Sequence, residues 1–481
     1  GGDLTWAEID SAEDIDRSLA QEARIEQLLR DHPWLTVCER VAKDSGFFHW
    51  ELDFSPVFAR GGFDLQVGNP PWVRPQSDIE ALLGESDPWW ILAHKPTQAA
   101  KAQRRELTLT RPGAIDTLAG GLSETLVTAS FLGSTVQYPL LAGQKADLYR
   151  AFMQRSWRSS NKRGIVSLVH PESVFTELKA APLRIECYTR LRRHWQFINE
   201  LKLFDIANLA SYSVSIYGNA VDRPGFLHAS SLYHPSTVTN SLLHDGTGPP
   251  PGIKTDAGTW DLSPHKDRVT RVGMKELSTW HSLLEQANSP IIETRMVYTV
   301  STTALKVLSK LADSNRMRDL PLCYSTGWNE TTDRRAGVFE TCWNNPGDWR
   351  RRIIQGPHIG VALPLAKEPN PSLKSHRDWS EIDLGGDQLE AAPPVSYSIE
   401  ISTEDYRLKF PSHSNPSANK KVLANSKHFL LAWRSMTNLT GSRTIISALY
   451  PPGTAHVHTV GSAIPIETTD SSSLLAAGTF M

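Results

Sequence analysis

The sequence predicts an α/β protein whose first half forms an open mixed sheet and whose second half is rich in short strands. Three observations lead to this prediction. Helical and strand patterns alternate over residues 63–195, two strand patterns follow each other over residues 197–217, and short apolar runs separated by polar stretches begin near residue 300. Alternating strands and helices are typical of parallel pairing, whereas consecutive strands with a short connection form antiparallel hairpins. We therefore expect an open sheet with an antiparallel hairpin at its edge.

The N-terminal region is expected to hold a helix and two strands. Ser11 and Asp14 are suitable helix-start residues, and apolar side chains then recur near helical spacing over residues 15–29. The aromatic run Gly46–Phe54 is strand-like. In Phe63–Gly68 apolar and polar residues alternate, and the two prolines that follow forbid continuation of this strand.

The central region alternates between helix and strand. Helical patterns cover Ala146–Trp157 and Pro182–Trp195, and the apolar run Gly164–Val169 between them is a buried-strand candidate. Strand patterns at Phe197–Phe204 and Tyr212–Tyr217 follow, and their seven-residue connection suits a hairpin.

Three parts are expected along the chain. The sheet occupies residues 1–235, the Gly- and Pro-rich segment DGTGPPPG marks a linker or insertion over residues 236–300, and residues 301–481 form the β-rich part. The strand-like runs of this last part are Arg352–Ile354, Ile359–Leu363, Tyr397–Ile401 and Arg443–Leu449.

Composition excludes several classes of protein. The chain has 481 residues, of which 40% are hydrophobic and 21% charged, so it is not mostly disordered. A net charge of −2 means that nucleic-acid binding would require a local basic face. No stretch approaches the roughly 20 apolar residues of a membrane helix, so no membrane partner is expected. The 4 cysteines lack CxxC spacing, which argues against a zinc site and fits a reducing cytoplasm, the expected location.

Both ends of the sequence are expected to be cuts through a longer protein. The chain opens GGDLTWAEID, without an initiator methionine or a signal peptide. It closes SSSLLAAGTFM, an apolar run with no polar tail.

The motif Asn69-Pro70-Pro71-Trp72 directly follows the strand Phe63–Gly68 and gives the clearest chemical signal. Two successive prolines lack N–H groups, so turn hydrogen bonds from these positions cannot occupy the carbonyls of Asn69 and Pro70. The Asn69 carboxamide adds an acceptor and Trp72 adds a flat face. A planar ligand could stack on Trp72 and donate both hydrogens of an exocyclic amino group to these oxygens. This suits methylation of an adenine or cytosine amine, because the nitrogen lone pair becomes free to attack a methyl sulfonium.

FDLQVGNPPW resembles motif IV of N6-adenine DNA methyltransferases, [DNS]PP[YFW], in the form typical of large type IIG and BREX- and DISARM-like phage-defence enzymes. Other segments resemble later parts of the same catalytic domain: KADLYRAF (Lys145–Phe152), GIVSLVHPESVF (Gly164–Phe175), AAPLR (Ala180–Arg184), FINELKLF and SYSVSIYG. YSTGWNET, QGPHIG and SRTIISALYPPGTAHVHTV resemble, more weakly, the family's target-recognition part.

The resemblance implies a fold, an activity and partners. Residues 1–235 would be the C-terminal half of a Rossmann-like class I methyltransferase domain, and residues 301–481 a truncated target-recognition domain. The implied activity is site-specific methylation of adenine N6 in double-stranded DNA, with S-adenosylmethionine as cofactor and base flipping as the means of access. Other restriction or phage-defence subunits would be partners.

The resemblance also implies roles for the motif residues. Asn69 and the Pro70 carbonyl would hold the target amino group, Pro71 would shape the turn near the methyl donor, and Trp72 would stack on the extruded base. The glycine-rich strand–turn–helix that binds the cofactor in this family is absent, since the G-x-G at Gly246–Gly248 lies in a proline-rich loop. We therefore expect the cofactor-binding half of the sheet to be missing, and this chain alone to bind the methyl donor poorly.

Residues at other strand and helix ends are secondary candidates. His170 and Pro171 end a parallel-type strand, where open α/β sheets place ligands, and could line the substrate cleft. Asp147 and Tyr149 are expected to fix their helix against the sheet, and Glu172 is expected to be solvated.

Charged residues admit two interpretations. A basic cluster after the turn could meet phosphates or form a solvated helix face: Lys95, Lys101, Arg104, Arg105 and Arg111. Arg334, Arg335 and Arg350–Arg352 could contact DNA or belong to an ordinary surface. His456 and His458 lack further ligands, so no metal is expected.

Several alternatives remain open at this point. NPP[YF]-type turns also serve methylation of RNA adenine or of protein glutamine. The chain could instead be a DNA-recognition subunit or fragment without independent catalysis. The simplest alternative is a proline turn with a packed tryptophan and no chemistry.

Overall fold

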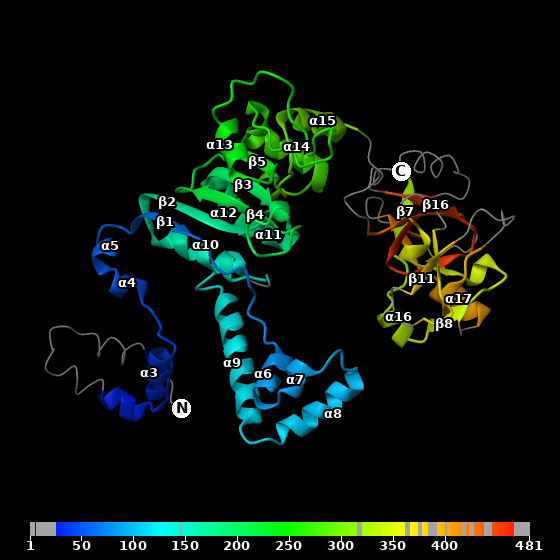
Figure 1. Cartoon of the computed structure of the whole chain (residues 1–481), viewed down its shortest axis with the longest axis horizontal. Coiled ribbons are helices and arrows are strands. Elements are labelled where there is room, and N and C mark those ends of the chain that lie inside the picture. Colours follow the sequence, from blue (N-terminus) through cyan, green and yellow to red (C-terminus); the bar gives the residue numbers. More distant parts are fainter. Residues whose placement is uncertain are drawn as a thin grey trace. The chain divides into compact units, whose positions relative to one another are not determined.

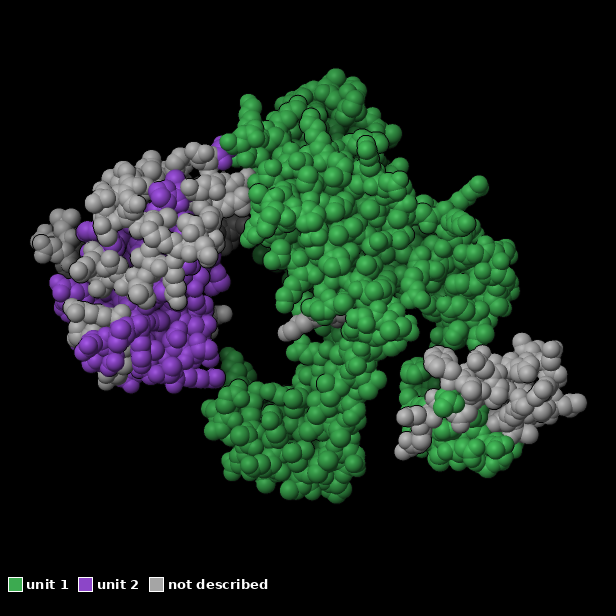
Figure 2. All heavy atoms as spheres, turned by 180° about the vertical axis from the view of Figure 1, so that it is seen from behind, with its two compact units in different colours: residues 1–313 green, residues 314–481 purple. Residues whose placement is uncertain are grey.

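The computed structural model describes residue 5 and residues 26–144, 147–314, 320–360, 366–373, 378–382, 392–399, 402–415, 420–422, 428–436 and 445–465. Most of the helix expected over residues 15–29 lies outside these described residues. The chain divides into two compact units, residues 1–313 and 314–481, which are coloured separately in Figure 2. The finer division at residues 235 and 300 stays a prediction.

Unit 1 is built on a six-stranded mixed sheet with the order β1-β2-β4-β3-β5-β6 (Figure 1). Its strands are β1 (Phe63–Gly68), β2 (Ser160–Pro171), β3 (Leu191–Ile198), β4 (Ser211–Tyr217), β5 (Phe226–Leu232) and β6 (Thr270–Val272). β1 pairs in parallel with β2, and β4 is antiparallel to both β2 and β3. β1, β2 and β3 therefore run in one direction, and their C-terminal ends lie at one edge of the sheet, here named the carboxyl edge.

Helices make up most of the rest of unit 1. The α-helices are α3 (Trp34–Asp44), α4 (Trp50–Asp53), α5 (Ser55–Ala59), α6 (Ile79–Ser86), α7 (Trp89–Leu92), α8 (Gln98–Leu109), α9 (Ala114–Leu132), α10 (Leu148–Ser159), α11 (Ser173–Thr176), α12 (Ala181–Arg190), α13 (Pro235–Ser241), α14 (Met274–Leu284) and α15 (Thr302–Ala312). The short 3-10 helices are η2 (Pro139–Leu141), η3 (Leu178–Ala180), η4 (Asn199–Leu201), η5 (Lys266–Arg268) and η6 (Ile291–Glu293). Side-chain caps begin several of them, because Asp78 accepts from two amides at the start of α6 and Thr97 accepts from one at the start of α8.

Hydrophobic cores lie on both faces of the sheet. On one face α10, α12 and α14 share a core with β2, to which β2 contributes Val166 and Leu168. On the other face α13 packs against β3, β4 and β5, and Val169 of β2 reaches this second core. Successive residues of β2 thus point to opposite cores, as the period of a strand requires. In α10, Tyr149 and Met153 are buried at a spacing of four residues, which turns one face of the helix to the sheet.

The expected hairpin exists, but its place in the sheet differs from the prediction. β3 pairs with β4, but the strand expected over Phe197–Phe204 is wrong for most of its length, because β3 ends at Ile198 and η4 begins at Asn199. Residues 199–210 connect the two strands, which is longer than the expected seven-residue connection. The hairpin lies inside the sheet rather than at its edge, because β3 also pairs with β5, and β6 continues beyond β5. The sequence of β5, FLHASSL, has few β-branched or aromatic residues, which is why its strand character was not predicted.

Two further sequence predictions are corrected. The aromatic run Gly46–Phe54 contains helix α4 instead of a strand. Its rings pack on each other and on the first residue of β1, with Trp50 and Phe54 centroids 5.6 Å apart and Phe54 and Phe63 centroids 5.2 Å apart, so the run needs no sheet partner. The helix expected over Pro182–Trp195 ends at Arg190, and Leu191 already begins β3.

Unit 2 is β-rich, as predicted. In its described residues one sheet has the order β14-β13-β7-β18-β15-β16, and three further sheets have two strands each. The strands are β7 (Leu322–Ser325), β8 (Glu340–Asn344), β9 (Ile353–Ile354), β10 (Lys367–Pro369), β11 (Trp379–Glu381), β12 (Val395–Ser398), β13 (His413–Asn415), β14 (Lys420–Val422), β15 (Leu430–Arg434), β16 (Ser447–Tyr450), β17 (Ala455–His456) and β18 (Val460–Pro465). The helices are α16 (Thr332–Arg335), α17 (Thr403–Lys409), η8 (Trp349–Arg351) and η9 (Gly356–His358).

Three of the four predicted runs overlap β9, β12 and β16, whereas most of Ile359–Leu363 lies outside the described residues. None of the helices in the described part of the chain combines the length and the apolarity needed to cross a bilayer.

Candidate active site

The turn Asn69–Trp72 leaves the sheet at the carboxyl edge. The pairing of Gly68 with Leu168 of β2 fixes where the turn begins. Asn69 and Pro71 are exposed, Pro70 is buried and Trp72 is half-buried. No hydrogen bond ties the Asn69 side chain to any residue that the structure describes, so its carboxamide oxygen is available as an acceptor.

The Trp72 indole is held at its edge and by two aromatic neighbours. Its Nε1 donates to the Val169 carbonyl at 3.2 Å. The ring centroid lies 5.7 Å from that of Tyr212, with planes inclined by 33°, and 6.0 Å from that of Phe204, with planes inclined by 60°. The indole is therefore a fixed, half-buried plane at the carboxyl edge. Tyr212 and Phe204 come from β4 and from the loop before it, so no pattern near the motif could have identified them.

His170 is the penultimate residue of β2. Its side chain is fully buried and stacks on Tyr149, with ring centroids 5.6 Å apart and planes inclined by 9°. Its Nε2 lies 2.8 Å from the Tyr217 hydroxyl, and burial lowers its pKa to about 4. Pro171 is partly exposed. The geometry gives His170 a packing role at this edge, and contact of His170 or Pro171 with substrate stays a prediction.

Glu172 is buried, so the expectation of a solvated carboxylate is wrong. His194 Nε2 lies 3.3 Å from one carboxylate oxygen, and the Tyr298 hydroxyl donates to the other. Burial alone would raise the pKa of Glu172, but the charge and hydrogen bond of His194, with further hydrogen bonds from Ser213 and Tyr298, lower it to about 2. These partners lie far away in the sequence, which is why the sequence did not indicate the burial.

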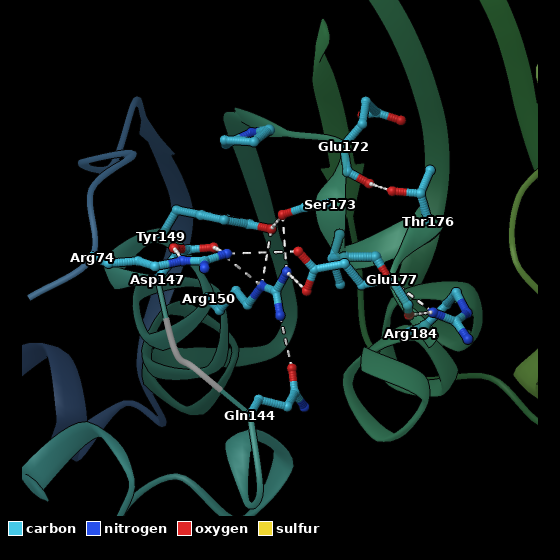
Figure 3. Close-up of polar contacts among 12 residues, drawn as sticks. Arg74, Gln144, Asp147, Tyr149, Arg150, Glu172, Ser173, Thr176, Glu177 and Arg184 are labelled. Carbon is cyan, nitrogen blue, oxygen red and sulfur yellow. Dashed lines mark hydrogen bonds and ion pairs between the residues drawn. The ribbon is translucent and has the colours of Figure 1, made fainter. Parts of the chain in front are cut away.

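Tyr149 fixes the start of α10 against the sheet through its stacking on His170 of β2, as expected, whereas Asp147 contacts the segment after the turn instead of the sheet. Asp147 binds the guanidinium of Arg74, two residues after Trp72, and the Tyr149 hydroxyl lies 2.7 Å from Ser173 Oγ (Figure 3). The Leu148 amide also donates to the Val73 carbonyl at 2.9 Å. The segment that follows the turn is thus attached to α10, a connection that the sequence analysis missed.

The basic cluster after the turn is largely paired. Lys101 Nζ lies 2.6 Å from Glu80, and Arg104 and Arg111 lie 2.6 Å and 3.3 Å from Asp87. The side chain of Asp87 is 1% exposed, and the hydrogen bond from Arg104 holds its pKa below the usual range against the opposing effect of burial. These pairs stabilise α6–α8, and phosphate contact by the cluster stays a prediction.

Basic residues of unit 2 fall into two groups. Arg352 is buried, and its guanidinium donates to the carbonyls of Pro346 and Pro393, so it supports the fold. Arg350 and Arg351 are exposed.

His456 of unit 2 is engaged in the fold. His456 is buried, with Nε2 2.7 Å from Ser462 Oγ. Among the described residues no group of three or more His, Cys, Asp or Glu side chains could hold a metal ion.

The described residues beside the turn do not form a complete pocket for the methyl donor. Asn69 and Pro71 could contact the methyl end of such a donor, because both are exposed beside β1. β1 is, however, the outermost strand of the sheet in the described part of the chain, and its Leu65 and Val67 are 62% and 73% exposed. With no glycine-rich strand–turn–helix in the sequence, the residues present do not fit the nucleoside part of the donor.

Comparisons with known proteins give one family match, in the N-terminal part of the chain. Residues 9–96 match the family model of the Eco57I restriction-modification methylase. No curated protein matches the chain.

Similar solved structures include three restriction-modification proteins. A type I methyltransferase subunit from Streptococcus thermophilus is 10% identical, with 24% of this chain and 27% of that chain covered and a TM-score of 0.19. The type IIL enzyme MmeI in complex with DNA is 9% identical, with 84% and 41% covered and a TM-score of 0.29. The EcoKI M protein is 11% identical, with 52% and 67% covered and a TM-score of 0.22.

The aligned part thus spans 27% of the first of these relatives. Over residues 9–96, which include β1 and the turn Asn69–Trp72, the chain is similar to restriction-modification methylases.

Proposed function

We propose that the chain carries the catalytic turn and the recognition part of a site-specific DNA adenine-N6 methyltransferase that uses S-adenosylmethionine. The observation that carries the proposal is an exposed Asn69 with no hydrogen bond from its side chain to a described residue, three residues before the Trp72 indole, which is anchored to Val169, in the turn that leaves the carboxyl edge of the sheet. The match of residues 9–96 to a restriction-modification methylase supports it. We further propose that the protein works in a restriction-modification or phage-defence system.

In the proposed reaction the target adenine leaves the duplex, because its amino group cannot reach a methyl donor while it is paired. Trp72 stacks on the extruded base, and the Asn69 side chain and the Pro70 carbonyl accept the two amino hydrogens. The amino nitrogen gains positive charge as the new bond to carbon forms, and two fixed acceptor dipoles stabilise that charge. Correct placement of the amino group can lower the activation free energy by about 7–11 kcal/mol.

No strongly basic side chain is needed for this chemistry. The titratable groups closest in sequence to the exit of β2, His170 and Glu172, are buried and engaged with Tyr217, His194 and Tyr298. When bound, S-adenosylmethionine would supply the methyl carbon: its S–CH3 bond breaks as the N–C bond forms, and it leaves as the neutral thioether S-adenosylhomocysteine. The proton that the methylated nitrogen then loses passes to water. The residues that hold the nucleoside part of the donor are proposed to lie outside this chain.

The substrate class is tested by methyl transfer from tritiated S-adenosylmethionine to phage DNA, total RNA and protein, with the full-length protein as enzyme. We expect label in double-stranded DNA, recovered as 6-methyladenine after digestion to nucleosides. Label in RNA or protein alone would assign the turn to a different substrate. Specific DNA binding without affinity for the donor would instead support a recognition subunit without catalysis.

A further inference from the structure

Four charged side chains, one of them from the segment that follows the turn, form a closed ring: Arg74, Asp147, Arg150 and Glu177 (Figure 3). Arg74 Nε binds Asp147, and Asp147 Oδ2 lies 3.8 Å from Arg150 Nε. Arg150 Nη2 lies 2.6 Å from one oxygen of Glu177, and the other oxygen lies 3.6 Å from Arg74 Nη2. Two cations and two carboxylates alternate, so the ring is neutral and each charge has two partners of opposite sign.

The ring joins three separate segments at the carboxyl edge. Arg74 belongs to the segment that follows the turn, Asp147 and Arg150 belong to the start of α10, and Glu177 lies between α11 and η3, after the exit of β2. The turn is thereby connected to the helix and to the strand exit that adjoin it.

Three members of the ring form a frame that does not depend on Arg74. The Arg150 side chain is 1% exposed and also donates to Tyr149 at 3.0 Å, Gln144 at 2.8 Å and Ser173 at 2.9 Å. The side chains of Asp147 and Glu177 are 10% and 41% exposed. Arg74 is 45% exposed, so its side chain docks onto a frame that is already held together by Arg150.

Apart from the ring, few polar contacts with described residues hold the turn segment. Pro70 and Pro71 donate no backbone hydrogen bonds. Beyond the ring, the segment is held by the hydrogen bond from Trp72 Nε1 to the Val169 carbonyl at 3.2 Å and by packing of the Trp72 ring against the two cores of unit 1. The hydrogen bond from the Leu148 amide to the Val73 carbonyl at 2.9 Å also holds it. Loss of Arg74 would therefore remove the charged attachment that fixes the downstream end of the turn.

We propose that Arg74 is a positioning residue that holds the Asn69 oxygen and the Trp72 ring in place before the base arrives. The inference rests on the proposed function for its effect on catalysis, but the positioning itself is a property of the fold. Acceptors fixed in advance lower the barrier because they do not reorganise during the reaction.

Hydrogen exchange tests the positioning without any assumption about activity. In the full-length protein, Arg74→Gln should accelerate amide exchange in the peptide that covers residues 63–78 by at least about fivefold. Arg74→Lys should have a smaller effect, because lysine keeps the positive charge but lacks the planar guanidinium that can donate to both carboxylates. The matched control is Arg295→Gln, which removes a similar pair with Glu285 (2.9 Å, side chains 33% and 10% exposed) away from the turn. Exchange in residues 63–78 that is unchanged by Arg74→Gln would overturn the proposal.

Kinetics then tests the consequence for methyl transfer. Arg74→Gln should lower kcat about tenfold or more, with KM for DNA changed less than twofold, whereas Arg295→Gln should leave kcat unchanged. A raised KM with unchanged kcat would show a phosphate contact instead and would contradict the positioning role. If the unaltered protein methylates no DNA, the proposed function fails, while the exchange result still decides the positioning.

Discussion

At the scale of single residues, the central feature is the contrast between Asn69 and Trp72. Asn69 is exposed and free to accept hydrogen bonds, whereas Trp72 is fixed through its Nε1 and two aromatic neighbours. A free acceptor beside a rigid plane is suited to a flat ligand with an amino group.

Substitutions at Trp72 should distinguish the contribution of ring stacking to the methyl-transfer rate from that of the indole N–H hydrogen bond. Trp72→Phe keeps an aromatic plane but loses the bond to the Val169 carbonyl, so methyl transfer should fall only moderately. Trp72→Ala also loses stacking, which is worth about 1–3 kcal/mol per base, and should be slower than Trp72→Phe by roughly 5- to 150-fold. Single-turnover rates with excess enzyme measure the difference. Equal losses in both variants would indicate misfolding rather than lost stacking.

The sequence alone could predict that Asn69 offers an acceptor and that the two prolines donate no backbone hydrogen bond, because both features follow from covalent chemistry within four adjacent residues. The roles of these residues in methyl transfer stay predictions. The sequence could not predict that Phe204 and Tyr212 pack beside Trp72, nor that Glu177 and Arg150 join Arg74 in a ring of charged side chains. Those contacts depend on how β2, β4 and α10 pack, and no local pattern encodes that packing.

At the scale of elements, the strand β1 and the helices after it give two tests. Gly62 precedes β1 with φ +115°, and a Cβ there would lie 2.4 Å from the Ser159 carbonyl oxygen. Gly62→Ala should therefore destabilise unit 1 by at least the cost of such a backbone conformation, on the order of 1–3 kcal/mol. Urea unfolding measures this cost. Gly120→Ala in α9 is the control, because nothing lies within 4 Å of its Cβ and alanine favours a helix. If Gly120→Ala lowered the free energy of unfolding as much as Gly62→Ala, the loss at Gly62 could not be attributed to its backbone conformation.

Arg104 of α8 should stabilise the fold without contacting DNA. Arg104→Gln leaves the buried Asp87 carboxylate without its nearest partner, so the melting temperature of unit 1 should fall. The salt dependence of DNA binding should not change, because a residue that contacts no phosphate releases no counterion. Anisotropy titrations of a labelled duplex at several salt concentrations provide the measurement. A decrease of about one in the salt slope would show that Arg104 contacts a phosphate.

At this scale the sequence predicted element types better than their arrangement. Phe63–Gly68, the buried strand and the helix over residues 146–157 were expected from periodicity, and all three exist. The position of the hairpin was wrong because β5 and β6 carry weak strand patterns and join the sheet only through pairing with β3 and each other. Tertiary pairing, rather than local propensity, decides that position.

At the scale of the whole molecule, both units bury histidines. Burial lowers the pKa of His170 in unit 1 to about 4, and those of His358, His413 and His456 in unit 2 to about 4, 3 and 4. An unfolded histidine binds a proton near pH 6.5. Between pH 6.5 and about 4 the unfolded chain therefore binds more protons than the folded one.

The free energy of unfolding should decrease as the pH falls from 6.5 to 4. Each such histidine contributes at most about 1.4 kcal/mol per pH unit in this range. Urea titrations at pH 7, 6 and 5 measure the slope, and His170→Gln should reduce it for unit 1. A stability that stays constant from pH 7 to pH 5 would show that these histidines do not remain neutral in the folded protein.

The most direct test of the proposed mechanism is single-turnover methyl transfer to double-stranded DNA by Asn69→Ala in the full-length protein. Loss of one fixed dipole aimed at a developing charge typically costs about 100- to 1000-fold in rate. The mechanism predicts a loss of that size with DNA affinity unchanged within about twofold. Methylation of adenine at the normal rate by this variant would contradict it.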